Sequence, residues 1–125
     1  DGIYAATLLV EMLAVTGQRL SELWAEIELL YGHMELVEKD YKFSQARRDE
    51  TFNLLMVDKL LPELSLQMDH VSYLDGCKVY FKNGGWIVIR FSGTEPLLRI
   101  FCEMEDMQTA RQVTKAFEDF LGLPA

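Results

Sequence analysis

The sequence is poor in the residues that several classes of function require. Cysteine occurs only twice, as Cys77 and Cys102, without the close spacing of a metal motif or of a disulfide framework. Proline occurs three times, and no apolar run approaches the roughly 20 residues of a membrane-spanning helix. We therefore expect two buried, reduced thiols, a cytoplasmic protein and no membrane partner.

Basic residues are also scarce. The chain has 12 lysines and arginines against 20 acidic residues, which gives a net charge of −8. A nucleic-acid partner favours a basic surface, so we expect no such partner. An acidic protein that binds an anion has to gather its few cations in one place. Clusters of arginine are therefore the features to look for.

The overall composition is that of a folded chain. Half of the residues are hydrophobic and 26% are charged, which excludes intrinsic disorder. A length of 125 residues is enough for one domain with a core. The sequence opens on Asp1-Gly2 without a signal-peptide pattern or an initiator methionine. We expect a fragment or a processed product.

Arginines are gathered in the stretch Arg-Phe-Ser-Gly-Thr-Glu-Pro-Leu-Leu-Arg at positions 90–99. Apolar runs at 86–89 and 98–102 are typical of strands, so the stretch predicts a polar loop between two strands. Pro96 would fix the exit of the loop. An ordinary turn with two solvated arginines is the alternative.

The residue types of this loop suit an oxyanion. Arg90 and Arg99 offer planar forks that match pairs of phosphate oxygens. The hydroxyl groups of Ser92 and Thr94 can each donate a hydrogen bond. Gly93 allows the backbone N–H groups to approach a ligand closely. These five residues are the predicted phosphate-binding site.

The full pattern Arg-x-Ser-Gly-Thr-Glu-Pro-x-x-Arg, followed by an apolar strand and Glu103, resembles a known motif. It is similar to the phosphate-binding loop in the last domain of the α-D-phosphohexomutases, which include phosphoglucomutases, phosphomannomutases and phosphoglucosamine mutases. The start of the chain, Asp1-Gly2-Ile3, resembles the end of the third domain of the same enzymes. We therefore expect residues 1–32 to be a remnant of the third domain and residues 33–125 to form the last, phosphate-binding domain.

The pattern of apolar residues predicts an α+β fold. Two helices, at 2–14 and from an N-cap at Ser21 to Gly32, would form a hairpin that precedes the domain. The domain itself would contain, in order, an irregular edge strand with a bulge or link at 33–43, a helix from Ser44 to about Leu61, a four-stranded antiparallel meander from 71 to 102, and a helix that begins at Asp106 and ends at Gly122. Two helices would cover one face of the sheet.

Arg47 and Arg48 fall in the first turns of the predicted third helix. We interpret them as part of a solvated helix face, and a second anion contact is the alternative. The two histidines, His33 and His70, have no Cys, Asp or Glu at a spacing typical of metal ligands. We interpret both as ordinary polar residues near loops, so no metal site is predicted in this chain.

The resemblance implies both the fold and the activity. The last domain of these mutases resembles half of the TATA-binding protein, and the enzymes interconvert hexose 1-phosphate and hexose 6-phosphate. They use a phosphoserine, a Mg²⁺ ion and a sugar-reading loop in earlier domains, and none of those motifs occurs here. This chain would therefore contain no catalytic residue and would bind the non-reacting phosphate of a hexose phosphate substrate. Its partners would be the missing N-terminal domains or, through residues 1–32, a second copy.

Two other functions remain open from the sequence. One is a free-standing phosphate-binding module with no enzyme attached. The other is a protein-interaction domain whose arginines pair with carboxylates of a partner. The preferred hexose is not encoded in these residues, because the resemblance places the sugar-reading loop before Asp1.

Overall fold

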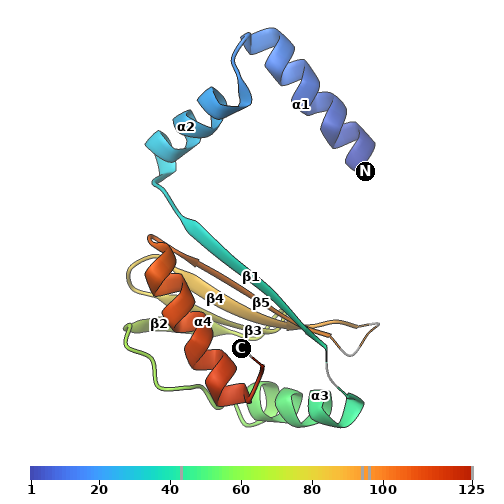
Figure 1. The fold of residues 1–125 in the computed structure, drawn as a ribbon, viewed down its shortest axis with the longest axis vertical. Coiled ribbons are helices and arrows are strands. Elements are labelled where there is room, and N and C mark those ends of the chain that lie inside the picture. The colour runs from blue at the N-terminus through green and yellow to red at the C-terminus, as the bar shows by residue number, and fades with distance from the viewer. Residues whose placement is uncertain (43, 94, 96, 125) are drawn as a thin grey trace. The chain divides into compact units, whose positions relative to one another are not determined.

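A computed structural model describes residues 1–42, 44–93, 95 and 97–124 of the chain. The chain divides into two compact units, Asp1–His33 and Met34–Ala125. The first unit contains two helices, and the second contains a five-stranded sheet with its covering helices (Figure 1). The α+β class predicted from the sequence is confirmed.

The first unit begins with α1, Gly2–Thr16. The carboxylate of Asp1 is its N-cap and accepts hydrogen bonds from the amide groups of Ile3 and Tyr4. Gly17 ends the helix in the left-handed conformation, with φ of 66°, and the last helical residue, Thr16, lies two residues beyond the predicted range of 2–14. The acidic cap explains why the helix begins at the second residue of the chain.

The second helix, α2, spans Leu20–Tyr31 and starts earlier than predicted. Ser21 lies inside the helix, and Arg19 takes the N-cap position instead. A side-chain oxygen of Glu22 accepts a hydrogen bond from the backbone N–H of Arg19 at 2.7 Å. This reach-back from the third helical residue satisfies the N-cap amide, so the helix starts without a hydroxyl cap. Gly32 ends α2 as predicted.

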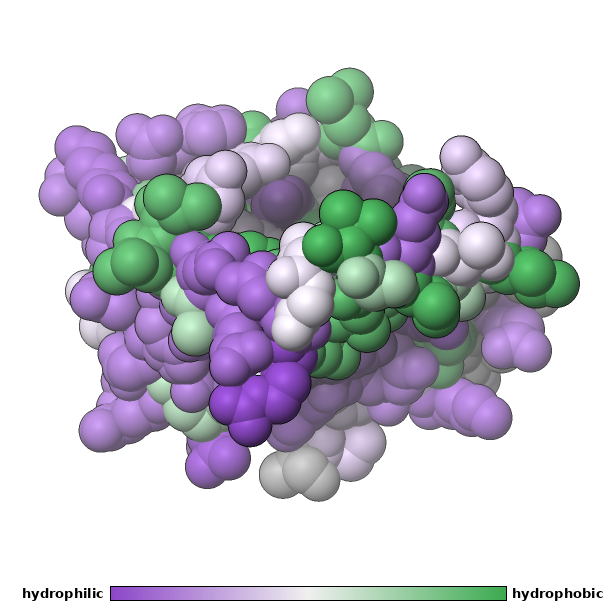
Figure 2. All heavy atoms as spheres, turned by 90° about the horizontal axis from the view of Figure 1, so that it is seen from above, coloured by the Kyte–Doolittle hydropathy of each residue, from purple (hydrophilic) through white to green (hydrophobic). Residues whose placement is uncertain are grey.

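Apolar side chains of the first unit are exposed. None of the residues of α1 and α2, all of which the structure describes, is buried. Green apolar spheres are visible at the surface of the molecule in Figure 2. The exposed large apolar residues of this unit are Ile3, Tyr4, Leu8, Leu9, Val10, Met12, Val15, Leu20, Trp24, Ile27, Leu29, Leu30 and Tyr31. Within the described part of the chain, no helix has the length and apolar character needed to cross a membrane.

The second unit is built on a sheet with strand order β1-β5-β4-β3-β2 (Figure 1). All neighbouring strands are antiparallel. The strands are β1 (Glu35–Lys42), β2 (Met68–Ser72), β3 (Cys77–Phe81), β4 (Trp86–Phe91) and β5 (Leu97–Met104). Strands β2 to β5 form the predicted meander, and β1 returns to the edge beside β5. Short turns that contain Gly76 and Gly84 connect β2 to β3 and β3 to β4.

The predicted irregularity in the first strand is wrong. β1 pairs with β5 in one continuous register, from Glu35 opposite Met104 to Lys42 opposite Leu97. Val37 and Tyr41 are buried, and Lys39 lies between them on the same face of the strand. Lys39 is tolerated there because its ammonium group pairs with Glu118 of the last helix at 2.5 Å. The charged Lys39 on the buried face makes the regular alternation of buried and exposed residues in β1 hard to recognise from the sequence.

The third helix is shorter than predicted. Instead of running to Leu61, α3 spans Gln45–Phe52 and continues as one π-helical turn, η1, at Asn53–Val57. The chain then leaves the helix through Lys59, which has a left-handed φ of 55°. The helix therefore ends several residues before Pro62, the residue that a helix running to Leu61 would have reached.

The predicted helix caps in the second unit are confirmed. The hydroxyl oxygen of Ser44 caps α3 by accepting a hydrogen bond from the amide of the third helical residue. The last helix, α4, spans Met107–Leu121, and Asp106 caps it by accepting from the amide of Thr109 at 2.8 Å. Gly122 ends α4 in the left-handed conformation. Short polar caps and a terminal glycine were reliable signals here.

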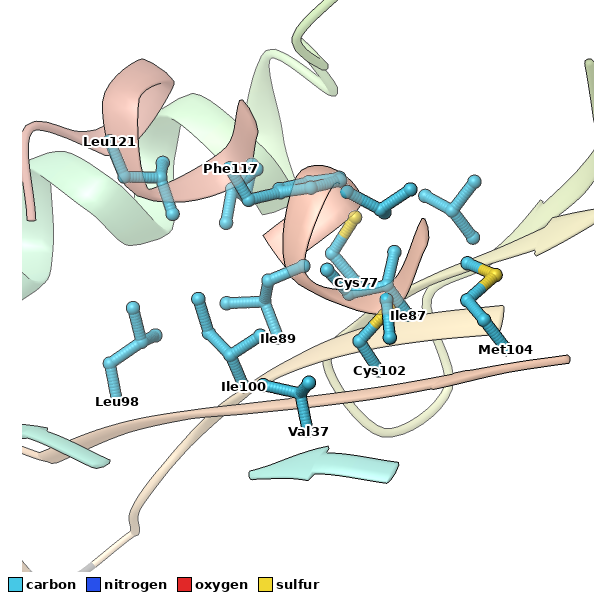
Figure 3. Close-up of a cluster of buried hydrophobic side chains, with 14 of the residues drawn as sticks. Val37, Cys77, Ile87, Ile89, Leu98, Ile100, Cys102, Met104, Phe117 and Leu121 are labelled. Atoms are coloured by element: carbon cyan, nitrogen blue, oxygen red, sulfur yellow. The ribbon is translucent and has the colours of Figure 1, made fainter. Parts of the chain in front are cut away.

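The hydrophobic core lies between one face of the sheet and the helices. Figure 3 shows side chains from the strands directed toward Phe117 and Leu121 of α4, with α3 beside it. The two cysteines belong to this core as free, buried thiols. Its members are Val37, Tyr41, Leu55, Cys77, Val79, Phe81, Ile87, Ile89, Leu98, Ile100, Cys102, Met104, Ala110, Val113, Phe117 and Leu121. The opposite face of the sheet carries the alternate residues of each strand.

One buried polar cluster links the edge strand to α4. The Glu118 carboxylate is 4% exposed and accepts hydrogen bonds from the Tyr41 hydroxyl and the Lys39 ammonium. Burial raises the pKa of Glu118, but the two donors outweigh burial, and the pKa lies below its ordinary value. Burial and the same carboxylate raise the pKa of Tyr41. The cluster is therefore an ionised carboxylate held by two donors.

Candidate functional site

Arg90 and Arg99 face each other across two neighbouring strands. Arg90 lies near the end of β4 and Arg99 near the start of β5, and the two residues are direct cross-strand partners. Their neighbours Ile89 and Ile100 are fully buried, whereas both arginine side chains are about half exposed. Since side chains alternate along a strand, both arginines project from the face of the sheet opposite the core.

This pair places two positive charges side by side. Like charges directly opposite each other in a sheet are destabilising. Each arginine also has a carboxylate on its outer side: Asp75 lies 3.0 Å from Arg90, and Asp40 of β1 lies 3.5 Å from Arg99. The order across the sheet is therefore acid, arginine, arginine, acid. Each arginine is thus paired with a carboxylate on the side away from the other arginine.

The loop after β4 completes the site. Its base is closed by a backbone hydrogen bond from the Ser92 amide to the Leu97 carbonyl at 2.9 Å. The Ser92 hydroxyl oxygen accepts a hydrogen bond from the Glu95 amide at 3.3 Å. Gly93 faces open space, since an added Cβ would meet nothing within 4 Å. The loop is therefore open to a ligand from outside.

Four of the five predicted site residues come together here. Arg90, Ser92, Gly93 and Arg99 line one open pocket of about 260 Å³, together with Phe91. The predicted contributions of Thr94 and Pro96 fall on residues outside those the structure describes. Guanidinium forks, a hydroxyl group and a glycine backbone on one pocket form a set of donors, which is the chemistry that an oxyanion requires.

A further arginine reaches this loop, and the sequence did not predict its role. The Nη2 atom of Arg48 donates a hydrogen bond to the Ser92 carbonyl at 3.4 Å. Its side chain is 24% exposed, so the interpretation as a solvated helix residue is wrong for Arg48. Its neighbour Arg47 donates instead to the Leu121 carbonyl at 2.6 Å, at the end of α4. No local pattern could reveal either contact, because each joins segments far apart in the chain.

Glu103, the acidic residue that follows the loop motif, lies outside the pocket. Its carboxylate accepts a hydrogen bond from the indole Nε1–H of Trp86 at 3.0 Å. Trp86 and Glu103 are cross-strand partners on β4 and β5. The contact ties two strands together, so Glu103 acts on the sheet that carries the site.

Across 1–42, 44–93, 95 and 97–124, no group of three His, Cys, Asp or Glu side chains could hold a metal ion.

Known proteins resemble this chain over most of its length. A family model described as phosphoglucomutase/phosphomannomutase, C-terminal domain, matches residues 18–120. A phosphoglucomutase/phosphomannomutase of Thermococcus kodakarensis is 31% identical, over 90% of this chain and 22% of the relative. A probable phosphoglucosamine mutase of Methanopyrus kandleri is 33% identical, over 97% and 25%. A phosphopentomutase of Thermococcus kodakarensis is 32% identical, over 82% and 22%. The chain thus spans a quarter or less of the length of these relatives.

Proposed function

The chain belongs to the phosphoglucomutase/phosphomannomutase C-terminal-domain family, and we propose that it is the part of a phosphohexomutase that binds the non-reacting phosphate of a hexose phosphate. The whole enzyme would interconvert hexose 1-phosphate and hexose 6-phosphate. In this proposal Arg90, Ser92, Gly93, Thr94 and Arg99 hold the phosphate that does not react.

The cross-strand pair of Arg90 and Arg99 is the observation that carries the proposal. Two adjacent guanidinium groups on an exposed sheet face add nothing to the core and repel each other. A phosphate dianion between them would relieve that repulsion and could accept a pair of hydrogen bonds from each fork. The hydroxyl group of Ser92 and the backbone of Gly93 lie on the same pocket and offer further donors.

The names of the relatives support a phosphate-binding role over a sugar-reading role. They include mutases of glucose and mannose phosphates, of glucosamine phosphate and of pentose phosphate. These substrates differ in the sugar and share the phosphate. A segment that is similar in all of them is best suited to the shared group, so we do not assign a preferred hexose to this chain.

Phosphate binding at this site would serve catalysis from a distance. The contact supplies binding energy away from the reacting centre, which can be used to orient the sugar against the attacking or transferring group. Because the site lies on a separate domain in this proposal, its movement onto the substrate could also exclude water. The chain would contribute no catalytic residue of its own.

A Mg²⁺ ion is part of the proposed full-length enzyme and would be bound by residues outside this chain. The described residues do not fit such an ion, because they form no cluster of metal ligands. We therefore derive no role for this chain in metal chemistry. Two free, buried thiols are compatible with the reducing cytoplasm, which we propose as the location.

The proposal is tested by an NMR titration of the chain with glucose 6-phosphate. The backbone amides of Ser92, Gly93 and Thr94 and the side-chain Nε–H groups of Arg90 and Arg99 should shift in a saturable manner. Glucose without phosphate is the control and should leave them unchanged. Affinity will be weak, since the contacts of the other domains are missing. Amides that stay unchanged with glucose 6-phosphate would refute the site, and a response confined to the Arg47 region would place the phosphate elsewhere.

The reading frame and the same titration separate the two alternative functions. A free-standing phosphate-binding module should have a reading frame that begins near Asp1. A protein-interaction domain should respond to a carboxylate-rich peptide and ignore glucose 6-phosphate. Finding several hundred coding residues before Asp1 would favour the enzyme.

A further inference from the structure

Arg48 reaches the phosphate loop from the helical side of the sheet. Its Nη2 donates to the Ser92 carbonyl at 3.4 Å, and its guanidinium carbon lies 5.9 Å from the centre of the Phe91 ring. Phe91 packs edge-on against Phe52 of α3, with ring centres 5.4 Å apart. The side chain of Arg48 is thus placed by contacts on α3 and on the loop at once.

The orientation of one peptide group follows from this contact. The Ser92 carbonyl belongs to the same peptide unit as the Gly93 N–H, and in a trans peptide the two groups point in opposite directions. Since the carbonyl is directed at Arg48 of α3, the Gly93 N–H is directed away from α3. α3 lies over the core face of the sheet (Figure 3), whereas Arg90 and Arg99 project from the other face. The N–H is therefore directed toward the side that carries the two arginines.

We propose that Arg48 is a positioning residue, which fixes the Ser92–Gly93 peptide so that the Gly93 N–H is presented to the phosphate. The inference rests on the proposed function of the loop. Gly93 makes such a clamp useful, because an added Cβ there would meet nothing within 4 Å and glycine has wide backbone freedom. Without the clamp the peptide has room to rotate. A donor that is oriented in advance binds an anion more tightly than one that must first be ordered.

Arg47 provides a matched control for this inference. It is the adjacent arginine on the same helix, and its guanidinium group donates to the Leu121 carbonyl at the end of α4 rather than to the loop. R47M and R48M remove the same charge and keep a long apolar stem. A difference in phosphate affinity between R47M and R48M therefore reports the contact with Ser92 and not the loss of one positive charge.

The test uses the 125-residue chain, inorganic phosphate as the probe, and NMR spectroscopy. In R48M the Ser92 carbonyl carbon and the Gly93 amide should shift even without ligand, and phosphate should bind about threefold to tenfold more weakly. R47M should stay within about twofold of the wild type. R48K keeps a positive charge and one donor nitrogen without the planar fork, so it should fold and recover part of the affinity. Thermal unfolding of each variant confirms that it is folded.

The remaining outcomes would contradict either the positioning role of Arg48 or the proposed function itself. R48M with an unshifted Ser92 carbonyl, or with wild-type affinity, would overturn the positioning role of Arg48 and leave the proposed function standing. An Arg48 Nε–H resonance that moves with phosphate as far as that of Arg90 would replace positioning by direct contact. Wild-type Ser92 and Gly93 amides that ignore phosphate would overturn the proposed function itself, and the inference with it.

Discussion

At the residue scale, the cross-strand arginine pair is the most informative feature of the molecule. Arg90 and Arg99 lie next to each other on an exposed face, each with one carboxylate partner at 3.0 or 3.5 Å. Exposed ion pairs of this kind contribute about 1 kcal/mol or less. The repulsion between the two guanidinium groups is of similar size, so the arrangement does little for folding. Binding of a phosphate between the two guanidinium groups, as proposed above, would account for the pair.

Replacing either arginine should weaken phosphate binding. We expect R90A and R99A each to lower the affinity for glucose 6-phosphate by roughly tenfold, because a charge-assisted hydrogen bond contributes about 1.5–3 kcal/mol and an exposed one less. R90K should recover the affinity only in part, since an ammonium group cannot pair two oxygens at once. The NMR titration described above measures the affinity of all three variants for glucose 6-phosphate. In a full-length enzyme kcat and kcat/KM should fall together, and variants with wild-type affinity would contradict the prediction.

The two thiols should be unreactive in the native state. Cys77 and Cys102 are fully buried, and burial raises the pKa of each to about 11. At neutral pH almost no thiolate is present, and the thiolate is the reactive form. We expect labelling by a disulfide reagent to be slow in buffer and fast in denaturant, with two equivalents reacted there. Rapid native labelling of either thiol would show that the core opens easily.

The Glu118 cluster should make stability depend on pH. Burial, outweighed by the donors Lys39 and Tyr41, leaves the pKa of Glu118 below its ordinary 4.5. A lowered native pKa stabilises the fold above the unfolded value, and the contribution is lost as the pH falls from about 4.5 through the native value. We expect E118Q to flatten this part of the pH profile of the free energy of unfolding. K39M should destabilise by about 1–3 kcal/mol, because the carboxylate loses one donor while staying buried. An unchanged acid profile in E118Q would assign the pH dependence to other carboxylates.

At the element scale, strands with a clean alternation could be predicted from the sequence. β3 buries Cys77, Val79 and Phe81 and is bounded by glycine-containing turns, so its period and limits were both visible. The regular alternation of β1 is hidden in the sequence by the apolar Leu36 on its exposed face and by Lys39 on its buried face. Its partner Glu118 follows 79 residues later, and no local pattern could connect them.

The residues of the proposed phosphate-binding loop could be predicted from one short stretch of sequence, whereas the support that α3 gives to the loop could not. Arg90, Ser92, Gly93 and Arg99 lie within one short stretch, so a strand-loop-strand pattern was enough to bring them together. Arg48 comes from α3, 44 residues before the carbonyl that it contacts. Only the packing of α3 beside the sheet creates that contact. Local chemistry was therefore predictable, and support from a distant element was not.

The turn between β2 and β3 should be far less tolerant of substitution than the turn between β3 and β4. Gly76 and Gly84 share a φ near 90°, so alanine strains both backbones by about 1–2 kcal/mol. At Gly76 a Cβ would also lie 2.3 Å from the Ile89 carbonyl oxygen, whereas at Gly84 it would meet nothing within 4 Å. We expect G76A to lower the free energy of unfolding by clearly more than G84A in denaturant titrations. Equal losses of unfolding free energy in G76A and G84A would show that the turn between β2 and β3 can shift away from β4.

G76A should also weaken phosphate binding, since Gly76 directly follows Asp75, the carboxylate that contacts Arg90. G84A lies at the other end of the sheet strands and serves as the control for general destabilisation. If G76A and G84A are both folded and bind phosphate with equal affinity, the turn that contains Gly76 has no influence on the site.

At the scale of the whole molecule, the two units differ in how they are stabilised. Every member of the hydrophobic core lies in the second unit. The helices of the first unit expose many large apolar residues, among them Leu9, Met12 and Trp24. Exposed apolar surface of this extent is typical of a site that another protein segment covers. We propose that the preceding domain of a longer chain, or a second copy, covers it.

Deleting residues 1–32 should therefore leave a folded remainder that still binds phosphate. The deleted helices contribute no buried residue, and the core from Val37 to Leu121 is retained in full. We expect the melting temperature to change by only a few degrees, on the order of the shift produced by 1 kcal/mol in a domain of this size. The amides of Ser92 and Gly93 should respond to glucose 6-phosphate as in the longer chain. Size-exclusion chromatography should show less self-association after the deletion, because the exposed apolar helices are gone. A truncated chain that loses its dispersed NMR spectrum would show that the helices belong to the same cooperative unit as the sheet.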